Sequence, residues 1–78
     1  MVLRMRKHTL GDLHRLARIH LEQAYGTGLR RHVVHSAEFF GDRLLIRVKV
    51  HLRRDESEHT VDLWLNRHGE LITLVERD

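Results

Sequence analysis

The longest regular pattern in the chain lies at 43–53, where apolar and polar residues alternate. The apolar members of this run are Leu44, Ile46, Val48, Val50 and Leu52. Alternation with a period of two is typical of a strand with one buried and one solvent-facing side. We therefore expect a long central strand, whose solvent-facing side carries Arg47, Lys49, His51 and Arg53.

The segment before this strand has a helical period instead. Thr9 followed by Asp12 resembles a helix-capping box, which places the first helical residue at Leu10. Apolar residues then recur at helical spacing, at Leu10, Leu13, Ala17, Leu21 and Ala24. Gly26 and Gly28 predict the end of the helix, because glycine adopts the left-handed conformation without steric cost. We expect a helix over 9–27, preceded at 1–8 by an arm or a short edge strand.

Three further alternating runs, at 31–40, 58–66 and 70–76, predict three more strands joined by short turns. Gly41-Asp42 fits a two-residue type II′ turn, and Gly69 suits a turn position with positive φ. The expected fold is therefore α+β: one N-terminal helix packed on a four-stranded antiparallel meander. The whole chain, 1–78, forms a single domain in this interpretation, with the sheet at 30–76.

The apolar pattern also predicts how the strands pair. We expect Val48 opposite His35, Leu52 opposite His59, and Leu63 opposite Thr73. This register places His35 and Thr73 on the inner face, toward the helix. On the outer face it brings Lys49 beside Asp62 and Arg47 beside Trp64.

Composition narrows the class of protein. The 78 residues include no cysteine and eight histidines, and the formal net charge is +3. No apolar stretch resembles a signal peptide or a membrane span, so we expect a cytoplasmic protein without membrane contact. The sequence also lacks the pairing of a nucleophile with a base, the close carboxylates or the glycine-rich loop of common enzyme sites. A non-enzymatic binding module without a metal or cofactor is therefore the expected class.

The main candidate site is a contact surface on the outer face. Trp64, Ile72 and Leu74 are apolar at positions predicted to face solvent, with Leu45 and Arg47 on the neighbouring strand. Such a surface indicates a protein partner, and we expect a homodimer that contacts another protein. The alternative within one chain is that the arm covers this surface through Val2, Leu3 and Met5.

Two further hypotheses use other residues. The net positive charge favours a nucleic acid or another polyanion. The residues that would contact it are Arg4, Arg6, Lys7, Arg30, Lys49, His51 and Arg53. A small ligand could instead bind between helix and sheet. The residues that would line its pocket are His35, Thr73, His20 and Tyr25.

The order of elements resembles the cystatin-like architecture, in which a short N-terminal segment and one helix precede a four-stranded meander. The run VDLWLNRHGELITLVE, Val61 to Glu76, is similar to the final hairpin of PepSY-type domains. The resemblance implies a small α+β binding or inhibitory module. The loop that in cystatins carries the Gln-x-Val-x-Gly motif here reads Phe40-Gly41-Asp42-Arg43, and the last hairpin has no Pro-Trp pair. Protease inhibition is therefore not implied. Asn66 also stands where PepSY-type domains commonly have an acid.

Overall fold

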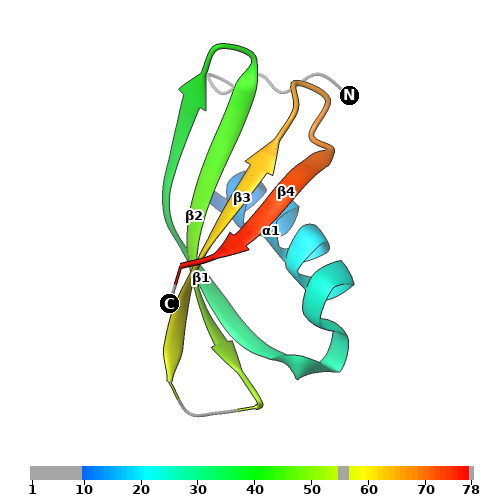
Figure 1. Cartoon of the computed structure of the whole chain (residues 1–78), viewed down its shortest axis with the longest axis vertical. Coiled ribbons are helices and arrows are strands. Elements are labelled where there is room, and N and C mark those ends of the chain that lie inside the picture. The colour runs from blue at the N-terminus through cyan, green and yellow to red at the C-terminus, as the bar shows by residue number, and fades with distance from the viewer. Residues whose placement is uncertain (1–9, 55–56, 78) are drawn as a thin grey trace.

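The computed structural model, which describes residues 10–54 and 57–77, contains one α-helix followed by four strands. The elements are α1 (Leu10–Tyr25), the 3₁₀ turn η2 (Gly26–Gly28), β1 (Leu29–Phe40), β2 (Arg43–Leu52), β3 (Glu58–Leu65) and β4 (Leu71–Glu76). The strands are antiparallel and lie in chain order in one twisted sheet, with α1 along one face (Figure 1). The predicted α+β fold is confirmed. The arm or edge strand expected at 1–8 lies outside the described residues.

The helix forms where the sequence predicts it and buries the middle of the predicted stripe, whereas Ala24 at its end is exposed. Leu13, Ala17 and Leu21 are buried against the inner face of the sheet. The helix ends before Gly26, whose φ of 56° is in the left-handed region that favours glycine. The other buried apolar residues come from β2 and β3, and they are Leu44, Ile46, Val48, Val50, Leu52, Val61, Leu63 and Leu65. The inner face of the central strand is therefore the middle of the core.

Polar contacts fix the helix to both ends of the sheet. The hydroxyl group of Tyr25 donates a hydrogen bond to Glu76 on β4, with an O–O distance of 2.7 Å. His20 donates from Nε2 to the carbonyl oxygen of Gly69, in the β3–β4 turn, over 2.9 Å. These bonds add directional contacts to the apolar packing between α1 and the sheet, which is not directional by itself.

The pairing of β1 with β2 differs from the prediction at a β-bulge. The turn is as expected, with Gly41 at φ 64°, and Ala37 pairs with Ile46. Beyond this pair, His35 is an extra residue on β1, so Val34 rather than His35 lies opposite Val48. A bulge shifts the strand by one residue and exchanges its two faces. The predicted inner position of His35 is therefore wrong, and this side chain is exposed.

The pairing of β2 with β3 is shifted by two residues from the predicted register. Val50 lies opposite His59, Arg47 opposite Asp62, and Leu45 opposite Trp64. A shift of two residues keeps every side chain on its predicted face. The outer-face neighbours change, however, so the expected contacts of Lys49 with Asp62 and of Arg47 with Trp64 are wrong.

A second bulge lies near the start of β4. Leu71 pairs with Leu65 as predicted, but Ile72 is an extra residue and Thr73 then pairs with Trp64. The bulge turns Leu74 to the inner face, where it packs against the core. The predicted inner position of Thr73 and outer position of Leu74 are therefore both wrong. Burying a leucine instead of a threonine favours the observed register.

Candidate interaction surface

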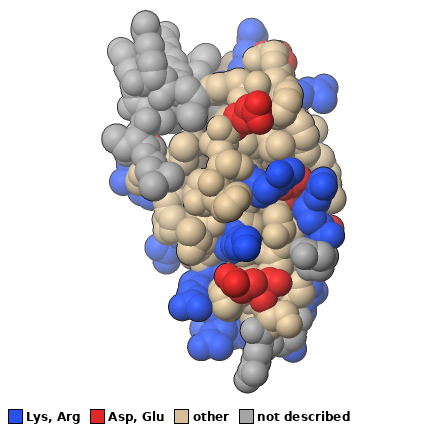
Figure 2. Space-filling model, turned by 90° about the vertical axis from the view of Figure 1, so that its left-hand side faces the viewer, with Lys and Arg blue, Asp and Glu red and all other residues tan. Residues whose placement is uncertain are grey.

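The outer face of the sheet, turned away from α1, carries both apolar and charged side chains. Figure 2 shows this face with a mostly uncharged surface in its upper half that is interrupted by an acidic group. Acidic and basic groups lie together near its middle, and basic groups lie around a further acidic group toward its lower end. The upper half corresponds to the end of the sheet at the β1–β2 turn.

Three residues form the aromatic patch, which we define as Phe40, Leu45 and Trp64. Leu45 and Trp64 lie directly opposite each other on β2 and β3. The ring centroids of Phe40 and Trp64 are 5.5 Å apart and the rings are tilted by 49°, a favourable aromatic geometry. Phe40 is 48% exposed, whereas Leu45 and Trp64 are half-buried. The patch therefore offers a preassembled apolar contact area.

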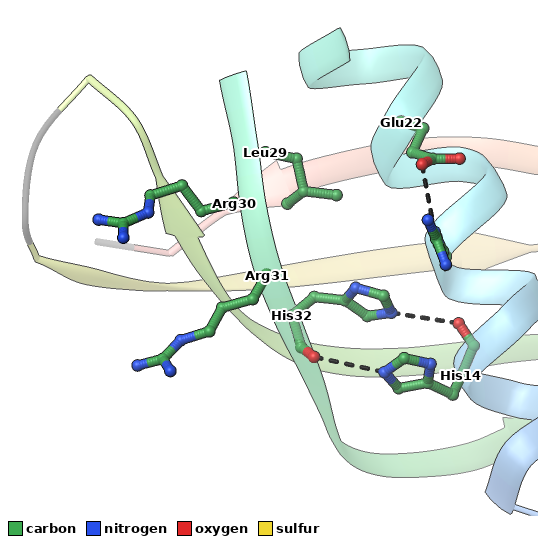
Figure 3. A pocket seen from close by; sticks show the side chains of 7 residues that line it. His14, Glu22, Leu29, Arg30, Arg31 and His32 are labelled. Carbon is green, nitrogen blue, oxygen red and sulfur yellow. Dashed lines mark hydrogen bonds and ion pairs between the residues drawn. The ribbon is translucent and has the colours of Figure 1, made fainter. Parts of the chain in front are cut away.

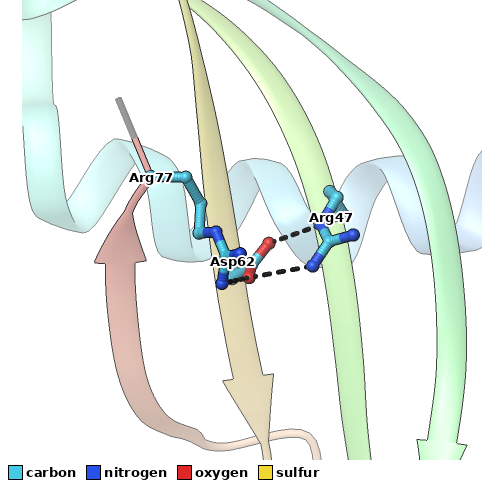
Figure 4. Close-up of polar contacts among 3 residues, drawn as sticks. All are labelled: Arg47, Asp62 and Arg77. Carbon is cyan, nitrogen blue, oxygen red and sulfur yellow. Dashed lines mark hydrogen bonds and ion pairs between the residues drawn. The ribbon is translucent and has the colours of Figure 1, made fainter.

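An ion cluster lies next to the aromatic patch, with Asp62 at its centre (Figure 4). The Asp62 side chain is 3% exposed and accepts hydrogen bonds from Arg47 Nε at 2.9 Å and Nη2 at 3.2 Å. Arg77 donates to the same carboxylate over 3.3 Å. The hydrogen bond to Asp62 raises the pKa of Arg47, so the guanidinium group stays charged. The cluster supplies two cations to Asp62, the only buried carboxylate among the described residues.

The basic end of the face, which we define as Arg30, Arg31, Lys49 and Arg53, lies beyond the ion cluster. The register places Arg31 opposite His51, and Lys49 opposite Val33 on the same face. Figure 3 shows Arg30 and Arg31 pointing away from α1, on the opposite side of β1 from His32 and Leu29.

Hydrogen bonds hold two members of the basic end. Arg53 donates from Nε to the carbonyl oxygen of Thr27 over 2.7 Å. Nε2 of His51 lies 3.4 Å from Nη2 of Arg31 and 3.1 Å from a carboxylate oxygen of Glu58. The carboxylate of Glu58 is thus directed at His51 rather than at an arginine.

A groove of about 270 Å³ separates α1 from the start of β1 (Figure 3). Its lining residues are His14, Arg18, Glu22, Leu29, Arg30, Arg31 and His32. The rings of His14 and His32 stack with centroids 4.0 Å apart. Each donates from Nε2 to the other's carbonyl oxygen, over 3.4 Å from His14 and 3.2 Å from His32. Burial lowers the pKa of His32, so the neutral form of its imidazole is favoured in this contact between α1 and β1.

The predicted contact residues only partly share one surface. Trp64, Leu45 and Arg47 lie on the outer face, while Leu74 lies on the inner face. Ile72, the extra residue of the β4 bulge, is 45% exposed.

The predicted polyanion contacts Arg30, Lys49, His51 and Arg53 all lie at the basic end or beside it. Arg4, Arg6 and Lys7, like the covering residues Val2, Leu3 and Met5, lie outside the described residues.

The proposed ligand-pocket residues point in different directions. His35 is exposed on β1, and Thr73 lies beside Trp64 on the outer face. His20 and Tyr25 do face the sheet, but each is hydrogen-bonded elsewhere, to Gly69 and Glu76. The pocket expected around His35 therefore has the wrong geometry.

Sequence reasoning missed several contacts that shape the site. The place of Phe40 on the outer face could have been predicted, because the β1–β2 turn was predicted correctly and the alternation of side chains along β1 then turns Phe40 outward. The pairing of Asp62 with Arg47 was missed because the predicted β2–β3 register was wrong by two residues. The stacking of His14 on His32 depends on the β1 bulge, which turns His32 inward, and the alternating pattern carries no sign of it.

In the described part of the chain, no group of three or more His, Asp or Glu residues is arranged to hold a metal ion. Within the same residues, no helix has the length and apolar character needed to cross a bilayer. No protein-family model matches this chain, and comparison with curated proteins and with solved structures gives no significant match.

Proposed function

We propose that this protein is a small non-enzymatic interaction module that forms a homodimer through the aromatic patch and contacts another protein through the outer sheet face. The observation that carries the proposal is the aromatic patch itself. One face of the sheet is covered by α1, yet the opposite face also presents packed aromatic and aliphatic side chains. A partially buried Trp with an apolar neighbour is typical of the centre of a protein interface.

The ion cluster supports the same interpretation. Burying an unpaired charge in an interface carries a large desolvation penalty. The penalty is smaller for a carboxylate that already forms ion pairs in the free protein. Asp62 is held by Arg47 and Arg77 before any partner arrives. The Asp62 carboxylate therefore keeps its partners when a second copy covers the patch and the cluster.

Trp64→Glu tests the dimer, because it places an unpaired charge in the centre of the patch. Light scattering or sedimentation at tens of micromolar should show a dimer for the wild type and a monomer for Trp64→Glu. Val33→Glu is the matched control, since Val33 is 61% exposed on the same face but lies toward the basic end. It should remain dimeric. A monomeric wild type, or equal dissociation of both variants, would rule out dimerisation through the patch.

A further inference from the structure

Among the described residues, the cations of the basic end differ from most of the other cations in having no carboxylate partner. Elsewhere, ion pairs join Arg15 to Asp12, Arg18 to Glu22, Arg47 to Asp62 and Arg54 to Glu76. Among the described residues, by contrast, no carboxylate forms an ion pair with Arg30, Arg31, Lys49 or Arg53. Their positive charge is therefore not neutralised within the described fold.

The fold brings these four cations together from two strands. The residues pair irregularly between Leu29 and Arg31, so the adjacent Arg30 and Arg31 both project to the outer side of β1 (Figure 3). Lys49 lies one pair further along the same face of β2. The backbone N–H group of Arg53 donates to the carbonyl oxygen of Gly28 over 2.8 Å, which ties the start of the β2–β3 connection to the start of β1.

The chemistry of this group favours phosphate. Guanidinium groups present several N–H donors in a planar fork that matches phosphate oxygens, and three of the four cations are arginines. Arg53 uses Nε for the bond to Thr27, and within the described residues its two terminal nitrogens form no hydrogen bond or ion pair. We propose that the basic end binds the sugar-phosphate backbone of a nucleic acid.

This inference goes beyond the proposed dimer and uses different residues. The aromatic patch lies on the other side of the ion cluster, so a dimer formed there leaves the basic end accessible. Contacts limited to phosphates fix position without reading bases, and the binding is therefore independent of nucleotide sequence.

Fluorescence anisotropy with labelled oligonucleotides of about 20 nucleotides, single-stranded and duplex, measures the number of phosphate contacts through the salt dependence. For four cations, the logarithm of the association constant should fall with the logarithm of salt concentration with a slope of about −3. The triple variant Arg30→Ala, Arg31→Ala, Lys49→Ala should reduce this slope to about −1, because each lost phosphate contact removes about 0.7 to 0.9 units and one contact remains. At low salt, it should also weaken binding more than tenfold.

The matched control removes the same net charge from positions away from the basic end, through Arg15→Ala, Arg43→Ala, Arg67→Ala. This variant should keep the wild-type slope. Equal loss in both triple variants would show attraction to net charge alone and would overturn the site, as would an absence of binding at low salt. Poly-glutamate, added at the same total charge as unlabelled nucleic acid, is the competitor. If it displaced the labelled oligonucleotide as effectively as unlabelled nucleic acid does, the site would be assigned to acidic polypeptides instead.

Discussion

Asp62 shows how one side chain determines the character of the outer face. The residues before and after it in β3, Val61 and Leu63, point into the apolar core. The Asp62 side chain lies on the opposite face of the sheet, away from α1, and is nevertheless only 3% exposed. Arg47 and Arg77 reach it from β2 and from the end of β4, so they shield the carboxylate while their own guanidinium groups stay partly exposed. Removing the carboxylate would leave the cations without their common acceptor.

We expect Asp62→Ala to lower the free energy of unfolding by about 2 kcal/mol, because charge-assisted hydrogen bonds to a buried group are lost. Chemical denaturation followed by circular dichroism measures the change. Arg77→Ala is the comparison, and it should cost less than about 0.5 kcal/mol because ion pairs of exposed side chains contribute little. Equal costs for the two variants would show that Asp62 is not the centre of the cluster.

At the scale of elements, the strands were predictable but the details of their pairing were not. Helix and strand boundaries follow from periodicity and from glycines such as Gly41. The β1 bulge could not be predicted in this way, because Val33 and Val34 are both apolar and either of them could occupy the position on the inner face. The β2–β3 register also cannot be fixed by alternation, since a shift of two residues preserves the faces and offers Asp62 either Lys49 or Arg47 as a partner. The resemblance to cystatin-like and PepSY-type modules and the cytoplasmic location stay predictions.

The bulge that turns His32 inward makes the attachment of α1 to β1 sensitive to pH. Burial lowers the pKa of His32 in the folded state below the ordinary value of 6.5. The neutral ring is therefore favoured by folding, and its stabilising contribution is fully present above about pH 6.5. This contribution is lost as the pH falls from 6.5 through the lower pKa of the folded state. The charged and titratable groups around the ring are Arg18 and Glu22 on the helix and the stacked ring of His14.

We expect the wild type to lose more stability than His32→Phe between about pH 7.5 and about pH 5, with a difference of at most about 1.4 kcal/mol per pH unit. Phenylalanine keeps an aromatic ring against His14 but does not titrate. Urea denaturation at both pH values gives the comparison. His35→Phe is the control at the exposed bulge position and should retain the wild-type pH dependence. If His32→Phe also retained the wild-type pH dependence, burial of His32 would not be the cause of that dependence.

For the whole molecule, the two faces of the sheet differ in what covers them. The inner face, with α1, forms a small core in which β2 and β3 supply most of the buried side chains. A domain of this size buries a smaller fraction of its surface than larger domains do, so its stability margin is narrow. Covering the aromatic patch with a second copy would bury further apolar surface and stabilise the folded state.

Dimerisation through the patch therefore predicts that thermal stability depends on protein concentration. Mass action favours the folded dimer as concentration rises, and a tenfold increase should raise the Tm by about 3 to 5 °C for a chain of this size. Differential scanning calorimetry over that range tests the wild type, and Val33→Glu should behave in the same way. Trp64→Glu should unfold at one Tm regardless of concentration. A constant Tm for a wild type that light scattering shows to be dimeric would mean that the dimer adds no stability, and that the patch is not its buried centre.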